Sequence, residues 1–271
     1  MVKNFIGKFI LIILAYILVS SILSIFLGNI PIHYYTILQI LIFLIPVFYI
    51  FKGIGNPIEL LKLNFNFSPK VIVFLLWAFL GISLFGIGWS IVQKIIIPES
   101  FFASFESLEN SIIAQQTEII QSSSISELLL KLLLVSIIPA FCEEVLFRGY
   151  LLENLKYKKY SNVFIVIFTS LCFTVVHFNL VGFVELFAIG IFLAAITLKT
   201  NSLIPAVFFH ILNNAVIVLA EYFNPGRNSV SSSNGLLIGI LFSVLGLVTV
   251  VISYSKIAKS KQNEEHLANI N

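Results

Sequence analysis

A small set of ionisable and polar side chains lies inside long apolar stretches of the sequence, where such groups are rare. The set consists of Glu143, Glu144, Arg148, His177, Glu185, His210 and Asn214. A charge at the centre of a membrane helix costs roughly 2.5–3.5 kcal/mol, so the two adjacent glutamates and the arginine together cost on the order of 10 kcal/mol. Because a whole domain is stable by only about 5–15 kcal/mol, we expect these groups to be paired or hydrated in a cavity.

Helical spacing assigns different tasks to the two glutamates. Glu144 and Arg148 are four residues apart with the acid first, which is the favoured order for an ion pair on a helix. Glu143 lies five residues before Arg148 and is rotated well away from it. We therefore expect Arg148 to occupy Glu144 and to leave Glu143 available for chemistry.

The two histidines each belong to a patterned helix face. His210 and Asn214 are four residues apart, and His177 follows Phe173 at the same spacing. A carboxylate and two neutral imidazoles suit the hydrolysis of a carbonyl compound in either of two ways. In one, Glu143 is the general base for a water that His177 holds, and His210 with Asn214 stabilises the oxyanion. In the other, Glu143, His177 and His210 bind a metal ion, for which zinc is the candidate, and the metal acidifies the water.

Other hydrolytic sites are not indicated by the sequence. It contains neither H-E-x-x-H, the signature of a zincin, nor G-x-S-x-G, the signature of a serine hydrolase. Cys142 stands beside Glu143 as a candidate thiol nucleophile, but a buried cysteine is usually inert packing. Glu185 follows Gly182 closely, so we expect it to begin a helix near the outer surface.

The helices that carry these groups must bring them to one depth. Glu143 and His177 come level if the helix that carries Glu143 continues up to a hairpin turn at residues 156–160. Glu143 then lies about 15 residues before the turn and His177 about 17 after it, which places both roughly 20–25 Å from the apex. Pro139 should kink this helix one turn before Glu143. His210 lies near the start of its own span, so it meets the others only if the helices tilt or the hairpin protrudes.

The composition places these groups in a membrane protein. Of the 271 residues, 59% are hydrophobic and 11% are charged, whereas soluble domains carry about 25% charge. A helix needs about 20 apolar residues to cross a bilayer. Candidate spans are residues 5–27, 35–51, 71–97, 126–147, 161–180, 182–198, 203–221 and 235–254. We predict an all-α, polytopic membrane bundle of about eight transmembrane helices, with the lipid bilayer as its environment.

The basic residues predict how this bundle is oriented. Lysine and arginine gather in alternate loops, and the opposite loops carry almost none apart from Arg227. Because such residues mark cytoplasmic loops, we predict a multi-pass protein of the plasma membrane with both termini in the cytoplasm. The first apolar run is too long for a signal peptide and lacks an A-x-A site, so we expect it to be retained. The net charge of +3 is small and dispersed, which excludes nucleic acid as an expected partner.

Three motifs, in this order, resemble those of the CPBP family. Glu143-Glu144-Val-Leu-Phe-Arg148 resembles its E-E-x-x-x-R motif, Phe173-Thr-Val-Val-His177 its F-x-x-x-H motif, and His210-Ile-Leu-Asn-Asn214 its H-x-x-x-N/D motif. The family includes type II CAAX prenyl endopeptidases and bacteriocin-processing or immunity proteins, the Abi-like group. The resemblance covers residues 126–220 and implies an eight-helix intramembrane protease whose site is open to the cytoplasmic side.

The resemblance also implies a role for each motif residue. Glu143 would be the water-activating base, His177 would help to hold the water, and His210 with Asn214 would form the oxyanion site. Glu144 and Arg148 would support the structure. The family is often called metalloprotease, yet some members look glutamate-dependent, so the use of zinc stays open.

The polar stretch 98–125 is the best candidate for a linker. We predict a division into N-terminal transmembrane helices with this linker (1–125), a CPBP-type protease core (126–221), and a last transmembrane helix with a cytoplasmic tail (222–271).

Three functions compete at this stage. The first is an intramembrane endopeptidase that cuts a membrane-associated peptide or protein of the CAAX type or of the leader or bacteriocin type. The second is a non-catalytic membrane scaffold or bacteriocin self-immunity protein of the same fold. The third, a transporter with an acidic proton relay, is disfavoured because the sequence has no evident inverted repeat.

Overall fold

The computed structural model describes residues 2–27, 31–98, 100, 117, 119–224 and 235–268. Its first helices are α1 (Phe5–Leu27), α2 (Ile32–Gln39), the π-helical η1 (Ile40–Leu44), α3 (Ile45–Lys52), α4 (Pro57–Leu60) and α5 (Lys70–Ile96). The next group is α7 (Ile125–Lys131), η2 (Leu132–Ile137), α8 (Ile138–Glu144), η3 (Val145–Leu152) and α9 (Glu153–Tyr157). The last four are α10 (Asn162–Val175), α11 (Phe183–Thr200), α12 (Ile204–Phe223) and α13 (Leu236–Ala268).

Within the part of the chain that the structure describes, seven helical stretches are long and apolar enough to cross a membrane. They are residues 5–26, 32–52, 70–96, 125–157, 183–200, 204–223 and 236–258, and the shorter apolar helix α10 is an eighth element. The prediction of an all-α membrane bundle of about eight helices is confirmed, and the protein is an integral membrane protein. Most of the predicted linker at 98–125 lies outside the described residues.

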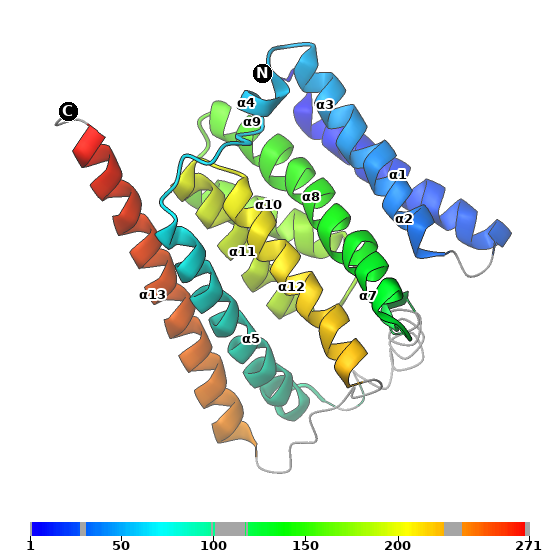
Figure 1. The fold of residues 1–271 in the computed structure, drawn as a ribbon, viewed down its shortest axis with the longest axis vertical. Helices are drawn as coiled ribbons and strands as arrows, with labels where there is room; N and C mark the ends of the chain where they lie inside the picture. The colour runs from blue at the N-terminus through cyan, green and yellow to red at the C-terminus, as the bar shows by residue number, and fades with distance from the viewer. Residues whose placement is uncertain are drawn as a thin grey trace.

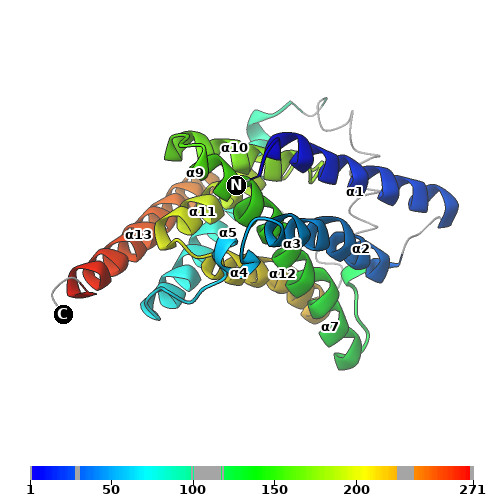
Figure 2. The ribbon, with the colours of Figure 1, turned by 90° about the horizontal axis from the view of Figure 1, so that it is seen from above.

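The helices lie side by side with similar tilts, with α5 and α13 at one flank and α1 to α3 at the other (Figure 1). Seen from above, α1 and the α2–α3 stretch extend outward on one side of the bundle, and α13 extends outward on the other (Figure 2). The start of α1, the helix α9 and the end of α13 lie toward one end of the bundle, and the Val2 backbone N–H donates to Asn154 at 3.2 Å. That this end faces the cytoplasm stays a prediction.

The stretch from α7 to α9 forms one continuous helix from Ile125 to Tyr157. It continues past Arg148 as predicted, and the described turn that follows, at residues 158–161, leads into α10. Two π-helical segments, η2 and η3, flank α8. The wider π turn ends just before Pro139, which has no N–H to donate to the helix ladder. The irregularity expected at Pro139 is therefore a change of helix type.

One predicted span ends earlier than the hydropathy suggested. The predicted span at 161–180 stops as a helix at Val175. Phe178 then adopts a left-handed backbone with φ 49°, which an L-residue in a continuing helix cannot have. His177 therefore lies in the turn beyond α10 and not within the helix, contrary to our prediction.

The N-terminal helices share a core with the helix that bears the first motif. Phe43, Val47 and Phe51 belong to one buried cluster with the apolar residues of η3, at positions 145–147 and 150–152. A second cluster joins α5, α11 and α12. The predicted division at residues 125 and 221 stays a prediction, but helices on both sides of residue 125 bury their side chains together.

Glycines allow α5 and α13 to approach closely. A Cβ on Gly81 would lie 2.8 Å from the Gly246 carbonyl oxygen, and one on Gly246 would lie 2.5 Å from the Gly81 carbonyl oxygen. Gly88 faces Gly239 and Ser243 in the same way. Without hydrophobic driving force inside a bilayer, such close backbone packing is what holds two membrane helices together.

Candidate active site

The three motifs meet at the centre of the bundle. Glu143 and Glu144 end α8, Arg148 follows in η3, His177 lies just past α10, and His210 is in α12. The structure thus brings together four segments that the sequence separates by up to 67 positions. His210 does meet the other groups, because its Nε2 lies 3.8 Å from Oε2 of Glu143.

Glu144 is fully buried and bound by two basic groups. Arg148 donates from Nη1 to Oε1 of Glu144 at 2.7 Å, which confirms the predicted ion pair. Nδ1 of His210 lies 2.8 Å from the same oxygen. Arg148 also donates from Nη2 to the Gly190 carbonyl oxygen at 3.2 Å. Glu144 was predicted only to support the structure with Arg148, and it also orients a histidine of the site.

Glu143 faces a different environment. Its Oε1 accepts a hydrogen bond from Nε2 of Gln39 at 3.0 Å. Its Oε2 is buried and has no hydrogen-bond partner among the described residues. This oxygen lies 3.6 Å from Nε2 of His177 and 3.8 Å from Nε2 of His210. Both separations exceed a direct hydrogen bond and are of the size that one intervening water spans.

Phe173 organises the rings around the site. The Arg148 guanidinium lies 4.5 Å from the centre of its ring, within range of a cation–π interaction. The rings of His177 and His210 lie 4.5 Å and 5.7 Å from it. The Phe173 carbonyl oxygen lies 2.7 Å from Nδ1 of His177. Phe173 of the second motif therefore contacts the site through both its side chain and its backbone. Its carbonyl oxygen holds His177, which lies outside the helix.

The site opens into a cavity of about 550 Å³. Its walls include the three groups that face one another and further amide side chains: Glu143, His177, His210, Asn179, Asn213 and Asn214. Apolar side chains such as Pro139, Ile189 and Ile217 line the remainder. The structure thus brings Asn214 to the same cavity as the histidines, as its spacing from His210 predicted.

The arrangement does not match a metal centre. Among the described residues, no group of three or more His, Cys, Asp or Glu side chains is placed to hold a metal ion. The proposed ligands Glu143, His177 and His210 share a cavity, but their atoms are spaced for hydrogen bonding through a water. Zinc ligation by these three side chains is therefore not supported.

Gln39 is a site residue that the sequence did not reveal. It stands 104 positions from Glu143 and belongs to α2. No spacing rule links residues on helices so far apart in the chain. The signal that was present is weak: Gln39 is a polar residue near the start of the predicted span 35–51, and polar groups inside such spans usually face the protein interior.

Glu185 and Cys142 take no part in the cluster. Glu185 lies in the first turn of α11, as predicted. It packs against Gly86 of α5, where an added Cβ would lie 2.5 Å from its carboxylate. Cys142 is fully buried in the hydrophobic core and has a free thiol.

Comparison with known proteins identifies one family. Residues 125–216 match the family described as type II CAAX prenyl endopeptidase Rce1-like. No curated protein and no solved structure matches the chain. The matched region begins at the first residue of α7 and ends within α12, so it contains all three motifs.

Proposed function

The chain belongs to the CPBP family through residues 125–216, and we propose that it hydrolyses a peptide bond with a water that Glu143 activates. The family supports intramembrane protease activity. We infer the mechanism and the substrate from the geometry of the described residues.

The observation that carries the proposal is the placement of one carboxylate oxygen. Oε2 of Glu143 lies 3.6 Å and 3.8 Å from two imidazole nitrogens. The Glu143 side chain is 13% exposed, whereas that of Glu144 is completely buried. A carboxylate at the wall of a cavity, held by an amide and not by an arginine as Glu144 is, has the position of a general base.

The hydrogen-bond partners of His177 define how it holds the water. Its Nδ1 faces the Phe173 carbonyl oxygen, which accepts and does not donate. Nδ1 therefore carries the proton, and Nε2 of the neutral ring presents a lone pair to the cavity. A water between Nε2 of His177 and Oε2 of Glu143 donates one proton to each, which points its own lone pairs at the substrate.

The reaction then proceeds in two balanced steps. As the water oxygen forms a bond to the carbonyl carbon, Glu143 takes its proton and the carbonyl π electrons move to oxygen. Collapse of this intermediate re-forms the C=O bond and breaks the C–N bond. Glu143 returns its proton to the leaving nitrogen, so the products are a carboxylic acid and an amine, and the base is regenerated.

His210 and Asn214 stabilise the oxyanion in this proposal. Nδ1 of His210 is bound to the Glu144 carboxylate and must carry a proton. His210 can therefore donate from Nε2 when both of its ring nitrogens carry a proton. The Asn214 amide, on the same wall of the cavity, supplies a neutral donor. Preorganised donors of this kind are worth about 10²- to 10³-fold each in rate.

The substrate that we propose is a membrane-associated peptide of the CAAX type or of the leader or bacteriocin type. The cavity of about 550 Å³ has the size of a small-molecule pocket, so it accepts the few residues around a scissile bond. Apolar walls beside asparagine amides suit an extended peptide, whose backbone needs hydrogen-bond partners inside a bilayer. We place the protein in the plasma membrane with both termini in the cytoplasm.

Replacement of Glu143 tests this function. The full chain in proteoliposomes is incubated with a library of membrane-anchored peptides, and cleavage is read by mass spectrometry. We expect Glu143→Gln to lower turnover by about 10²- to 10⁴-fold, the usual contribution of general-base catalysis. Glu59→Gln, at an exposed glutamate, is the matched control and should keep full turnover. Unchanged turnover in a correctly inserted Glu143→Gln variant would remove the proposal.

A further inference from the structure

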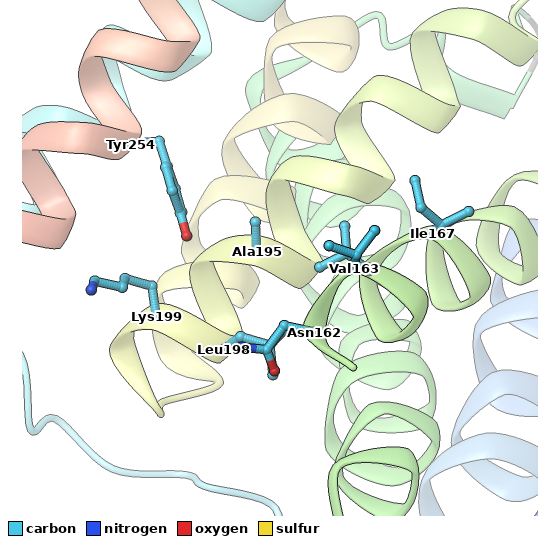
Figure 3. A pocket seen from close by; sticks show the side chains of 8 residues that line it. Asn162, Val163, Ile167, Ala195, Leu198, Lys199 and Tyr254 are labelled. Carbon is cyan, nitrogen blue, oxygen red and sulfur yellow. The ribbon is translucent and has the colours of Figure 1, made fainter. Parts of the chain in front are cut away.

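A second cavity, of about 300 Å³, lies between α10, α11 and α13 (Figure 3). In the figure Lys199 and Tyr254 stand on one side, Val163 and Ile167 on the other, and Ala195 between them. The lining residues are Asn162, Val163, Val166, Ile167, Ala195, Leu198, Lys199 and Tyr254. None of them lines the cavity of the candidate active site. On both α10 and α11 the nearest lining residues of the two cavities are six positions apart, or roughly 9 Å along these helices.

This cavity, which we call the α10–α13 groove, opens toward the bilayer. Val163 is 74% exposed and Ile167 is 45% exposed on the outer face of α10. Both belong to an apolar helix of the membrane region. The molecules that surround such a face are lipids, so an acyl chain is the apolar ligand available to it at the highest concentration.

The polar groups of the groove gather at one end. Lys199 lies in the last turn of α11, and Asn162 is the first residue of α10. The lining contains no acidic residue, and the described residues give Lys199 no ion-pair partner. Lys158 and Lys159, exposed in the turn before Asn162, add to the positive potential at this end. The groove therefore joins an apolar wall to a cationic rim.

We propose that the α10–α13 groove binds an anionic phospholipid. One acyl chain lies against Val163, Ile167 and Ala195, and the phosphate lies at Lys199. The Tyr254 hydroxyl and the Asn162 amide are the further donors. A lysine near the membrane surface favours an anionic lipid by the equivalent of about fivefold in affinity. A zwitterionic headgroup also carries a cationic group, and the lining of the groove has no acidic side chain to bind that cation.

Lipid titration of the full chain tests this site independently of protease activity. The detergent-solubilised protein is titrated with phosphatidylglycerol or with phosphatidylcholine of the same acyl chains, and bound lipid is counted by native mass spectrometry. We expect one phosphatidylglycerol to bind at least fivefold more tightly than phosphatidylcholine. An excess of inorganic phosphate should not displace it, because phosphate lacks the acyl chain.

Two variants and one control locate the lipid. Lys199→Gln should lose the preference for phosphatidylglycerol, and Ala195→Phe should lose binding of both lipids because the ring fills the groove. Lys70→Gln, at an exposed lysine that begins α5, should bind as the wild type does. Equal binding of the two lipids by wild type would overturn the proposal, as would an unchanged preference in Lys199→Gln. If Ala195→Phe fails to fold, the proposal is still tested by comparing the preference for phosphatidylglycerol in Lys199→Gln with that in Lys70→Gln.

Discussion

Two adjacent glutamates have different surroundings because successive residues point about 100° apart around a helix. Glu144 faces the core and shares one oxygen between Arg148 and His210. Glu143 faces the cavity. The Gln39 amide donates to its Oε1, and its Oε2 faces the two histidines without a hydrogen-bond partner among the described residues. In the mechanism that we propose, Glu144 therefore holds the charges of Arg148 and His210 in place while Glu143 gains and loses a proton. This separation of two carboxylates is a general way to divide catalytic tasks.

Replacement of Gln39 tests whether its hydrogen bond positions Glu143 for catalysis without a role in substrate binding. Gln39→Met keeps the shape of the side chain but removes the donor to Glu143. A hydrogen bond to a charged group is worth about 1.5–3 kcal/mol, so we expect kcat to fall about tenfold to hundredfold. KM should stay the same, because Gln39 does not line the cavity.

Thr36→Val is the control for Gln39→Met. Thr36 lies one turn earlier in α2 and donates to the Leu134 carbonyl at 2.9 Å, so it joins the same two helical regions without reaching Glu143. Its loss should lower stability and leave kcat unchanged. Equal losses of kcat in the two variants would show that Gln39 acts only by holding helices together.

At the scale of helices, packing between α5 and α13 depends on residues without side chains. A Cβ on Gly88 would lie 2.6 Å from the Gly239 carbonyl oxygen and would also press on the backbone of Ser243. Backbone atoms cannot move aside as the end of a flexible side chain can. In contrast, a Cβ on Gly7 of α1 meets nothing within 4 Å.

Gly88→Ala should destabilise the bundle, and Gly7→Ala should not. Overpacking of this kind typically costs about 1–3 kcal/mol, whereas alanine at an open helical position is neutral or favourable by up to about 1 kcal/mol. Thermal unfolding in detergent measures the difference through Trp77 and Trp89, the two tryptophans of the chain, both in α5. An unfolding midpoint for Gly88→Ala at or above that of wild type would contradict the packing described here.

At the scale of the whole molecule, hydropathy and spacing predicted most of the fold. Long apolar runs fix the number of helices, because a bilayer admits few other structures. The i,i+4 rule predicted the Glu144–Arg148 pair, since both residues belong to one helix. It gave no information on Gln39, or on the bond between Glu144 and His210, because these join separate helices. The early end of α10 was missed because the turn at residues 176–182 is nearly as apolar as a span.

Orientation in the membrane is a property of the whole chain that labelling can test. Lys158 is exposed at the turn before α10, and Leu180 is 58% exposed at the turn after it. In a Cys172→Ala background, we expect a membrane-impermeant thiol reagent to label Lys158→Cys only from the cytoplasmic side. Leu180→Cys should be labelled only from the outer side. The reverse pattern would show that the termini lie outside.

The central claim, that one water lies between Glu143 and His177, is tested most directly by an experimental density map that resolves ordered water. The account predicts a single water within about 2.6–3.2 Å of both Oε2 of Glu143 and Nε2 of His177. A direct hydrogen bond between these two side chains would contradict it. So would a density peak at about 2.0–2.1 Å from both imidazole nitrogens, because that distance is a metal–ligand bond.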